Sequence, residues 1–229
     1  MQPSGADGKL GSPVKLCLFD LDNTLIDGDS DLLWSELLAR DGALDVEPVR
    51  RWHLDYHRGT LDIEAFLAFQ LAPLAREPED RLAAWRDEFL AEYVRPRIKP
   101  RAREAVARHA ALGHELVLIT ATNAFLAEPI ARELAIPHLL ATEPERVDGR
   151  ATGRVDGVPC YRDGKIAHLE RWLAARGVAL PDVGESWFYS DSHNDVPLLL
   201  VVDHPVAVDP DERLAERARR EGWRVERWR

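Results

Sequence analysis

Carboxylates gather in one short stretch of the sequence, KLCLFDLDNTLIDGDSD, which runs from Lys15 to Asp31. Asp20 follows an apolar run directly, and Asp22 stands two residues further on. Like charges this close repel one another, and a bound divalent cation would balance them. Such a cation would also reconcile the acidity of the chain with any anionic substrate.

Two other parts of the chain carry polar residues at the ends of apolar runs. HELVLIT ends in Thr120, and SWFYS is followed by Asp191. Ligands of open parallel sheets bind at the carboxyl ends of the strands, so these residues should meet the first pair. Mg²⁺ takes oxygen ligands, and Asp20, Asp22 and Asp191 could supply part of its shell.

The elements that must position these residues follow an alternating pattern. Apolar runs at 14–19, 114–120, 138–142, 186–190 and 205–209 predict buried strands, with amphipathic helices between most of them. A Gly/Asp-rich segment at 145–161 predicts a hairpin. This pattern predicts an α/β fold with a parallel sheet covered on both faces. Residues 30–95 show only helical periodicity and read as an insert in that core.

Composition narrows the class of protein further. The 229 residues carry a net charge of −10, which argues against a nucleic-acid surface. The two cysteines are too few for a disulfide framework. The first thirteen residues lack the features of a signal peptide and read as a flexible tail, and no segment is apolar enough to span a membrane. We expect a cytoplasmic protein, monomeric or homodimeric, with no nucleic-acid or membrane partner.

Four motifs taken together resemble the haloacid dehalogenase superfamily of phosphatases. They are FDLDNTL, LITATN with Thr120, RDGKIAHL with Lys165, and SDSHNDVPLL, and their order matches across essentially the whole chain. The resemblance implies a Rossmann-like, doubly wound core at 14–27 and 97–229. It also implies an inserted all-helical cap of the type I (C1) subclass at 28–96. That subclass includes phosphoserine phosphatase-like enzymes.

The resemblance also implies roles for the motif residues. Asp20 would be the nucleophile that forms an aspartyl-phosphate. Asp22 would protonate the leaving alcohol and then deprotonate the attacking water. Thr120 and Lys165 would hold the phosphoryl oxygens.

The same resemblance implies a Mg²⁺ site and its support. Asp191 would complete the site together with the Asp20 carboxylate and the Asp22 carbonyl. Asn194 and Asp195 would support it, with Asp195 orienting Lys165 or a metal-bound water. His193, in the same motif, reads as a loop residue.

The cap is expected to select the leaving group. Asp29 occupies the position where phosphoserine phosphatases carry a glutamate that engages the substrate's amino group. Gln70 falls where those enzymes carry an arginine for the substrate carboxylate, and glutamine cannot provide that charged fork. Arg58 could compensate for it. Asn123 is also predicted to bind substrate, whereas Trp34, Trp52, Phe66 and Trp85 read as cap core rather than as a substrate cage.

These residues favour an amino-alcohol phosphate that lacks a carboxylate, with L-histidinol phosphate as the first candidate. A subgroup of the type I cap enzymes that this chain resembles includes histidinol-phosphate phosphatases. Phosphoserine phosphatase and a broad small-metabolite phosphatase are the alternatives. A phosphotransferase and a catalytically silent phospholigand-binding protein are the readings from other classes.

Overall fold

The computed structural model describes residues 14–45 and 47–229, so the predicted tail at 1–13 lies outside the described residues. The strands are β1 (Lys15–Phe19), β2 (Glu115–Asn123), β3 (His138–Thr142), β4 (Pro144–Val147), β5 (Arg150–Val155), β6 (Glu185–Ser190), β7 (His204–Val208) and β8 (Arg224–Glu226). The helices are α1 (Ser30–Arg40), α2 (Glu47–Arg58), α3 (Ile63–Arg76), α4 (Glu79–Glu88), α5 (Pro100–Ala111), α6 (Ala124–Glu133), α7 (Asp163–Ala174), α8 (Val196–Leu199) and α9 (Glu212–Glu221).

The core is a six-stranded sheet whose neighbouring strands all pair in parallel. Its order is β3-β2-β1-β6-β7-β8. The chain builds outward from β1 in one direction through β2 and β3, and then returns to build in the other direction from β6. The order therefore reverses beside β1, which is where an open α/β sheet forms a ligand crevice.

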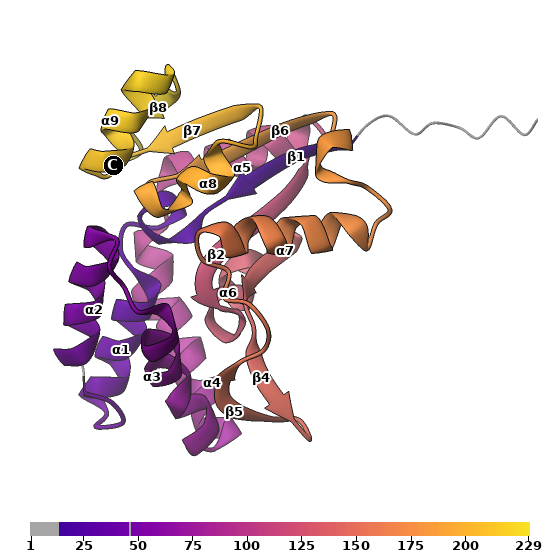
Figure 1. Ribbon diagram of the computed structural model, residues 1–229. Coiled ribbons are helices and arrows are strands. Elements are labelled where there is room, and N and C mark those ends of the chain that lie inside the picture. The colour runs from indigo at the N-terminus through magenta and orange to yellow at the C-terminus, as the bar shows by residue number, and fades with distance from the viewer. Residues whose placement is uncertain (1–13, 46) are drawn as a thin grey trace, which may run out of the picture.

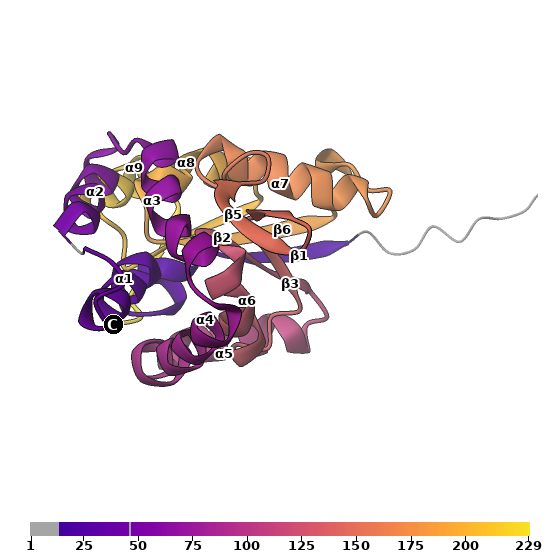
Figure 2. The ribbon, with the colours of Figure 1, turned by 90° about the horizontal axis from the view of Figure 1, so that it is seen from below.

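Both faces of this sheet are buried. Along β1, Leu16 and Leu18 pack with α7, α8 and α9, whereas Cys17 and Phe19 pack with α5 and α6. Figure 2 shows α7 and α8 on one side of the strands and α5 and α6 on the other. The α/β, doubly wound fold expected from the sequence is confirmed.

Helices α1 to α4 lie together beyond the carboxyl end of β1 (Figure 1). Trp34 of α1 and Trp85 of α4 are buried in the same apolar cluster as Phe19 of β1, so this helical insert is fastened to the core. The hairpin β4–β5 packs closely on α3. Gly153 of the hairpin lies so near Ala75 of α3 that a Cβ atom added to the glycine would be 3.4 Å from the Ala75 Cβ. A segment outside the predicted cap range thus covers one side of the cap helices.

Two details differ from the expected elements. Strand β2 continues three residues beyond Thr120, with a shift of register against β3 between Ile119 and Asn123. The short edge strand β8 was not expected, because three residues carry no readable alternation. No helix in the described part of the chain is both long and apolar enough to cross a membrane.

Candidate active site

The first motif forms an irregular turn at the carboxyl end of β1. Asp20 is still extended, and the turn Leu21–Leu25 then contains Asn23 in the left-handed region, with φ of 55°. Asparagine tolerates that conformation better than most residues. The Asn23 N–H donates to the Gly28 carbonyl at 2.9 Å, which closes the turn. This closed turn holds Asp20 and Asp22 beside one another at the end of the sheet.

A buried chain of charges links the first, third and fourth motifs. Lys165 Nζ donates to Asp20 Oδ1 and to Asp195 Oδ2, both at 2.7 Å. Lys165 is 2% exposed, and although burial lowers its pKa, Asp195 and Asp20 together raise that pKa above its usual value. Burial raises the pKa of Asp20 to about 6, with Lys165 opposing and Asp195 assisting the shift. Asp20 is therefore largely ionised at neutral pH and oriented by a permanent cation.

Thr24 joins two of the carboxylates, a role that the sequence analysis did not assign. Its hydroxyl lies 3.2 Å from Asp20 Oδ2 and 3.3 Å from Asp191 Oδ1, and it accepts the Asp191 N–H at 3.0 Å. Burial, followed by the charges of Asp20 and Asp195, raises the pKa of Asp191. The structure thus brings Asp191 to Asp20, as the predicted meeting of strand ends requires.

Asp22 is held by a second set of donors. Its Oδ1 accepts the Ser30 N–H at 2.6 Å, and its Oδ2 accepts the Thr122 hydroxyl at 2.8 Å. Burial raises the pKa of Asp22 to about 7, with Asp29 and Asp20 adding to the effect. Thr120 lies alongside, and its Oγ1 is 3.1 Å from the Thr122 hydroxyl. A carboxyl group with this pKa can both donate and accept a proton near neutral pH.

These oxygens fit a hard divalent cation. No group of three or more His, Cys, Asp or Glu side chains among the described residues is arranged to hold a metal. The implied set needs only two side chains, Asp20 and Asp191, together with the Asp22 carbonyl. Burial raises the pKa values of both side chains, and the charge of Asp20 raises that of Asp191 further. A bound cation would stabilise the ionised form of both carboxylates.

A pocket opens to solvent above these residues. Its floor comes from the core and its walls come from the helical insert. The described residues that line it are Asp20, Asp22, Asn23, Asp29, Asp31, Leu32, Val49, Trp52, His53, Tyr56, Leu61, Ile63, Phe66, Thr120, Ala121, Tyr161 and Asp191.

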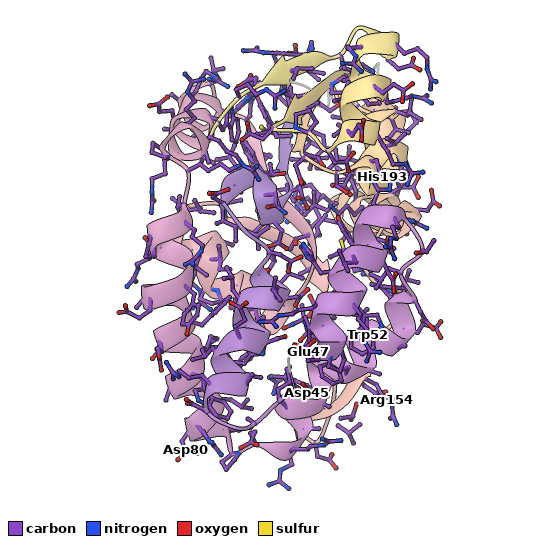
Figure 3. The ribbon with its side chains drawn as sticks, turned by 90° about the vertical axis from the view of Figure 1, so that its left-hand side faces the viewer. Asp45, Glu47, Trp52, Asp80, Arg154 and His193 are labelled. Carbon is purple, nitrogen blue, oxygen red and sulfur yellow. The ribbon has the colours of Figure 1, made fainter. Side chains whose placement is uncertain are left out.

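The aromatic lining corrects one sequence interpretation. Trp34 and Trp85 are buried in the apolar core, as expected. Trp52 and Phe66, however, line the pocket with their rings 5.8 Å apart in an edge-on arrangement, so reading them only as cap core was wrong. Both lie on amphipathic helices whose periodicity does not distinguish a wall facing a ligand from one facing a neighbour. Figure 3 shows Trp52 on α2, among the helices of the insert.

Of the residues predicted to bind substrate from the cap, only Asp29 lines the pocket. Gln70 is 1% exposed and faces α1, where its amide donates to the Asp31 carbonyl and accepts from the Ser35 hydroxyl. Arg58 is exposed and forms an ion pair with Asp55. The structure therefore does not bring Gln70 or Arg58 to this site.

Asn123 and Asn194 also lie outside the pocket lining. Asn123 caps α6, its Oδ1 accepting the Leu126 N–H at 3.3 Å. Asn194 accepts from Tyr161 and Arg162 and donates to the Tyr56 carbonyl at 3.2 Å. Asn194 thus connects the fourth motif to α2 of the insert.

The carboxyl end of α2 is held by two arginines as well as by Asn194. Arg162 donates to the Gly59 carbonyl at 2.7 Å and to Asn194, and Arg213 donates to the Arg58 carbonyl at 3.1 Å. Positive groups suit this end of a helix, where carbonyls lack partners within the helix. His193 lies near the same helix end and contacts Arg213 Nη1 at 2.9 Å (Figure 3). We call the contacts of Arg162, Asn194 and Arg213 with residues 56–59 the α2 clamp.

Comparison with known proteins connects this geometry to one family. A family model for haloacid dehalogenase-like hydrolases matches residues 17–200. A histidinol-phosphatase of Neisseria meningitidis serogroup C is 44% identical over 215 residues, which cover 92% of this chain and 97% of that protein. A phosphoserine phosphatase of Mycobacterium tuberculosis is 36% identical over 215 residues, which cover 90% of this chain and 68% of that protein.

A solved structure shares the fold at comparable sequence similarity. The crystal structure of a protein of unknown function from Bordetella pertussis Tohama I superimposes with a TM-score of 0.87 at 45% identity. The match covers 94% of this chain and 99% of that one. The fold of this chain is therefore one already observed by crystallography.

Proposed function

The chain belongs to the haloacid dehalogenase-like hydrolases and is a phosphatase of that family, and on this premise we propose that it hydrolyses small amino-alcohol phosphates, with L-histidinol phosphate as its preferred substrate. The 44% identical histidinol-phosphatase, matched over nearly its full length, supports this choice. The charge of the pocket supports it independently.

The observation that carries the proposal is the composition of the pocket lining. Among the described residues it includes five aspartates and no lysine or arginine. A substrate carboxylate would meet neither of the cations that usually bind it, whereas an ammonium or imidazolium group would be attracted. Histidinol phosphate carries two basic nitrogens and no carboxylate. Its imidazole ring also suits the wall formed by Trp52, Tyr56 and Phe66.

In the first chemical step, a carboxylate oxygen of Asp20 attacks phosphorus and the bond from phosphorus to the substrate oxygen breaks. Protonated Asp22 gives its proton to the departing alkoxide, which leaves as the alcohol. Lys165 and Thr120 are proposed to stabilise the phosphoryl oxygens, because Lys165 donates to the attacking carboxylate and Thr120 lines the pocket beside it. The product of this step is an aspartyl-phosphate and an ionised Asp22.

In the second step, Asp22 takes a proton from a water molecule whose oxygen attacks phosphorus. The bond from phosphorus to Asp20 breaks, and inorganic phosphate leaves. The pKa of Asp22 near 7 lets one group serve in both steps at neutral pH. Mg²⁺ bound by Asp20, Asp191 and the Asp22 carbonyl would neutralise charge on the transferring group.

Phosphoserine is the second candidate, favoured by the 36% identical phosphoserine phosphatase. The lack of lysine or arginine in the described lining counts against it. The deciding experiment compares kcat/KM for histidinol phosphate, phosphoserine, phosphoethanolamine and p-nitrophenyl phosphate, each with Mg²⁺ and with EDTA. We expect histidinol phosphate to lead and EDTA to remove activity. A clear preference for phosphoserine would refute the substrate assignment.

Asp20→Asn tests the chemistry separately from the substrate. The variant keeps the size of the side chain but loses the nucleophilic charge, so phosphate release should fall below detection. Rapid acid quenching should trap phosphoprotein in the native enzyme and none in the variant. Release that survives the substitution would exclude the covalent route.

A further inference from the structure

Asp31 is the second residue of α1, and it differs from every other carboxylate of the pocket. It is 8% exposed, and it lines the pocket beside Leu32. Its main-chain carbonyl accepts hydrogen bonds from Ser35 and Gln70. Its carboxylate, in contrast, has no hydrogen bond or ion pair with any of the described residues.

Asp29, two residues earlier, is engaged on both oxygens. Its Oδ1 accepts the Leu32 N–H at 2.9 Å and thereby caps α1. Its Oδ2 contacts His53 Nδ1 at 3.1 Å, and this hydrogen bond raises the pKa of His53 against the effect of burial. Asp29 therefore already has a structural task and a hydrogen-bonded histidine partner.

A buried carboxylate without a partner is costly to the folded chain. Burial and the charges of Asp29 and Asp22 raise the pKa of Asp31, which shows how poorly its surroundings accommodate the negative charge. A cationic ligand would supply the missing partner. Asp31 lines the pocket, which gives such a ligand access to it.

We propose that Asp31, rather than Asp29, is the specificity-determining carboxylate that accepts N–H bonds from the cationic nitrogen of the substrate. This inference rests on the proposed function and sharpens it. Asp29 then serves to cap α1 and to hold His53 at the edge of the same pocket. The aspartate that the motif spacing singles out and the one that meets the substrate are different residues.

Two groups can supply that nitrogen, an alkylammonium or an imidazolium, and they share the chemistry of a cation with N–H donors. Trp52, Tyr56 and Phe66 line the pocket together with Asp31 and would flank either group. Substrates that carry only one of the two groups show which of them Asp31 binds. Phosphoethanolamine carries the ammonium alone, and 2-(imidazol-4-yl)ethyl phosphate carries the imidazole alone.

The test compares Asp31→Asn with Asp29→Asn and with a matched charge control, Glu64→Gln. Glu64 lies in the first turn of α3 and is exposed, so its substitution removes one negative charge from the insert without touching the pocket. Each variant is assayed for kcat/KM on histidinol phosphate, the two single-cation phosphates and p-nitrophenyl phosphate. Thermal unfolding without substrate checks that each variant is folded.

Asp31→Asn should lower kcat/KM for the cationic substrates by about 10- to 100-fold, the effect of losing a hydrogen bond to a charged group. The loss for p-nitrophenyl phosphate should stay below about threefold, and Glu64→Gln should change none of the ratios. The single-cation phosphate that loses more activity identifies the group that Asp31 meets. The variant should also melt no lower than the native enzyme, because it removes an unpaired buried charge.

Equal losses on cationic and neutral substrates would overturn the inference, and so would a loss of preference in Asp29→Asn that Asp31→Asn does not share. The proposed function fails differently. In that case the native enzyme itself shows no preference for cationic phosphates over p-nitrophenyl phosphate, whatever the variants do.

Discussion

Replacing Asp22 by asparagine should inactivate the enzyme and, at the same time, stabilise its metal-free fold above neutral pH. The pKa of Asp22 rises from 3.8 to about 7 on folding, chiefly through burial and then through Asp29 and Asp20. The folded chain therefore binds this proton more tightly than the unfolded chain does. Stability from this group is fully present below pH 3.8 and is lost as the pH rises through about 7.

The size of the effect follows from that shift. About three pKa units correspond to about 4 kcal/mol, since one unit is worth about 1.4 kcal/mol. Asp22 is only partly buried at the pocket floor, so solvent screens part of this cost. We therefore expect Asp22→Asn to raise the free energy of unfolding by about 2 kcal/mol at pH 8, or about 4–8 °C in Tm for a chain of this length. At pH 4.5 the gain should fall below about 1 kcal/mol.

The assay is urea unfolding followed by tryptophan fluorescence, in EDTA, at several pH values between 4.5 and 8. Phosphate release measured with Mg²⁺ should fall by about 10²- to 10⁴-fold, the usual contribution of a general acid–base group. The asparagine keeps an acceptor for the Ser30 N–H, so the local turn is preserved. A gain in stability that does not grow with pH, or a loss at pH 8, would refute the reasoning about burial.

The α2 clamp and the aromatic wall support two further predictions. Arg162→Ala removes the hydrogen bonds from the guanidinium to Gly59 and Asn194. The KM for histidinol phosphate should therefore rise about tenfold. An unchanged KM would contradict a role of Arg162 in closing the pocket. Arg154→Ala, on the exposed hairpin, is the matched control. Trp52→Ala should raise the KM for histidinol phosphate by more than about tenfold, because the ring lines the pocket. The KM for phosphoethanolamine, which has no imidazole, should rise by less than about threefold. Equal effects on the two substrates would argue against contact between Trp52 and the imidazole.

The sequence alone was enough to predict which residues meet at the floor of the pocket, because strand ends are readable locally. An apolar run that stops at a carboxylate marks both a buried strand and the edge at which it ends. Parallel pairing then brings such edges together, which is why Asp20, Thr120 and Asp191 could be predicted to meet. Lys165 came from its motif, and its two ion pairs in the structure agree with a place beside Asp20.

The cap residues were harder to assign because periodicity identifies a buried face without identifying what covers it. Gln70 and Trp52 both lie on amphipathic helices. One turns toward α1 and is bonded inside the insert, whereas the other lines the pocket. Their difference depends on how α2 and α3 are rotated against α1, and that rotation is set by packing between separate segments.

Polar partners also belong to the tertiary structure. Thr24 and Thr122 contact the proposed metal-binding and catalytic carboxylates across 167 and 100 residues of sequence, and although Thr24 lies within the first motif, no local pattern indicates which distant carboxylate either threonine meets. The tertiary structure also distinguishes Asp29 from Asp31. The sequence determined that acidic residues would enter the pocket at the start of α1, because the chain leaves β1 there. Only folding decided which of them is satisfied by the protein and which is left to meet a ligand.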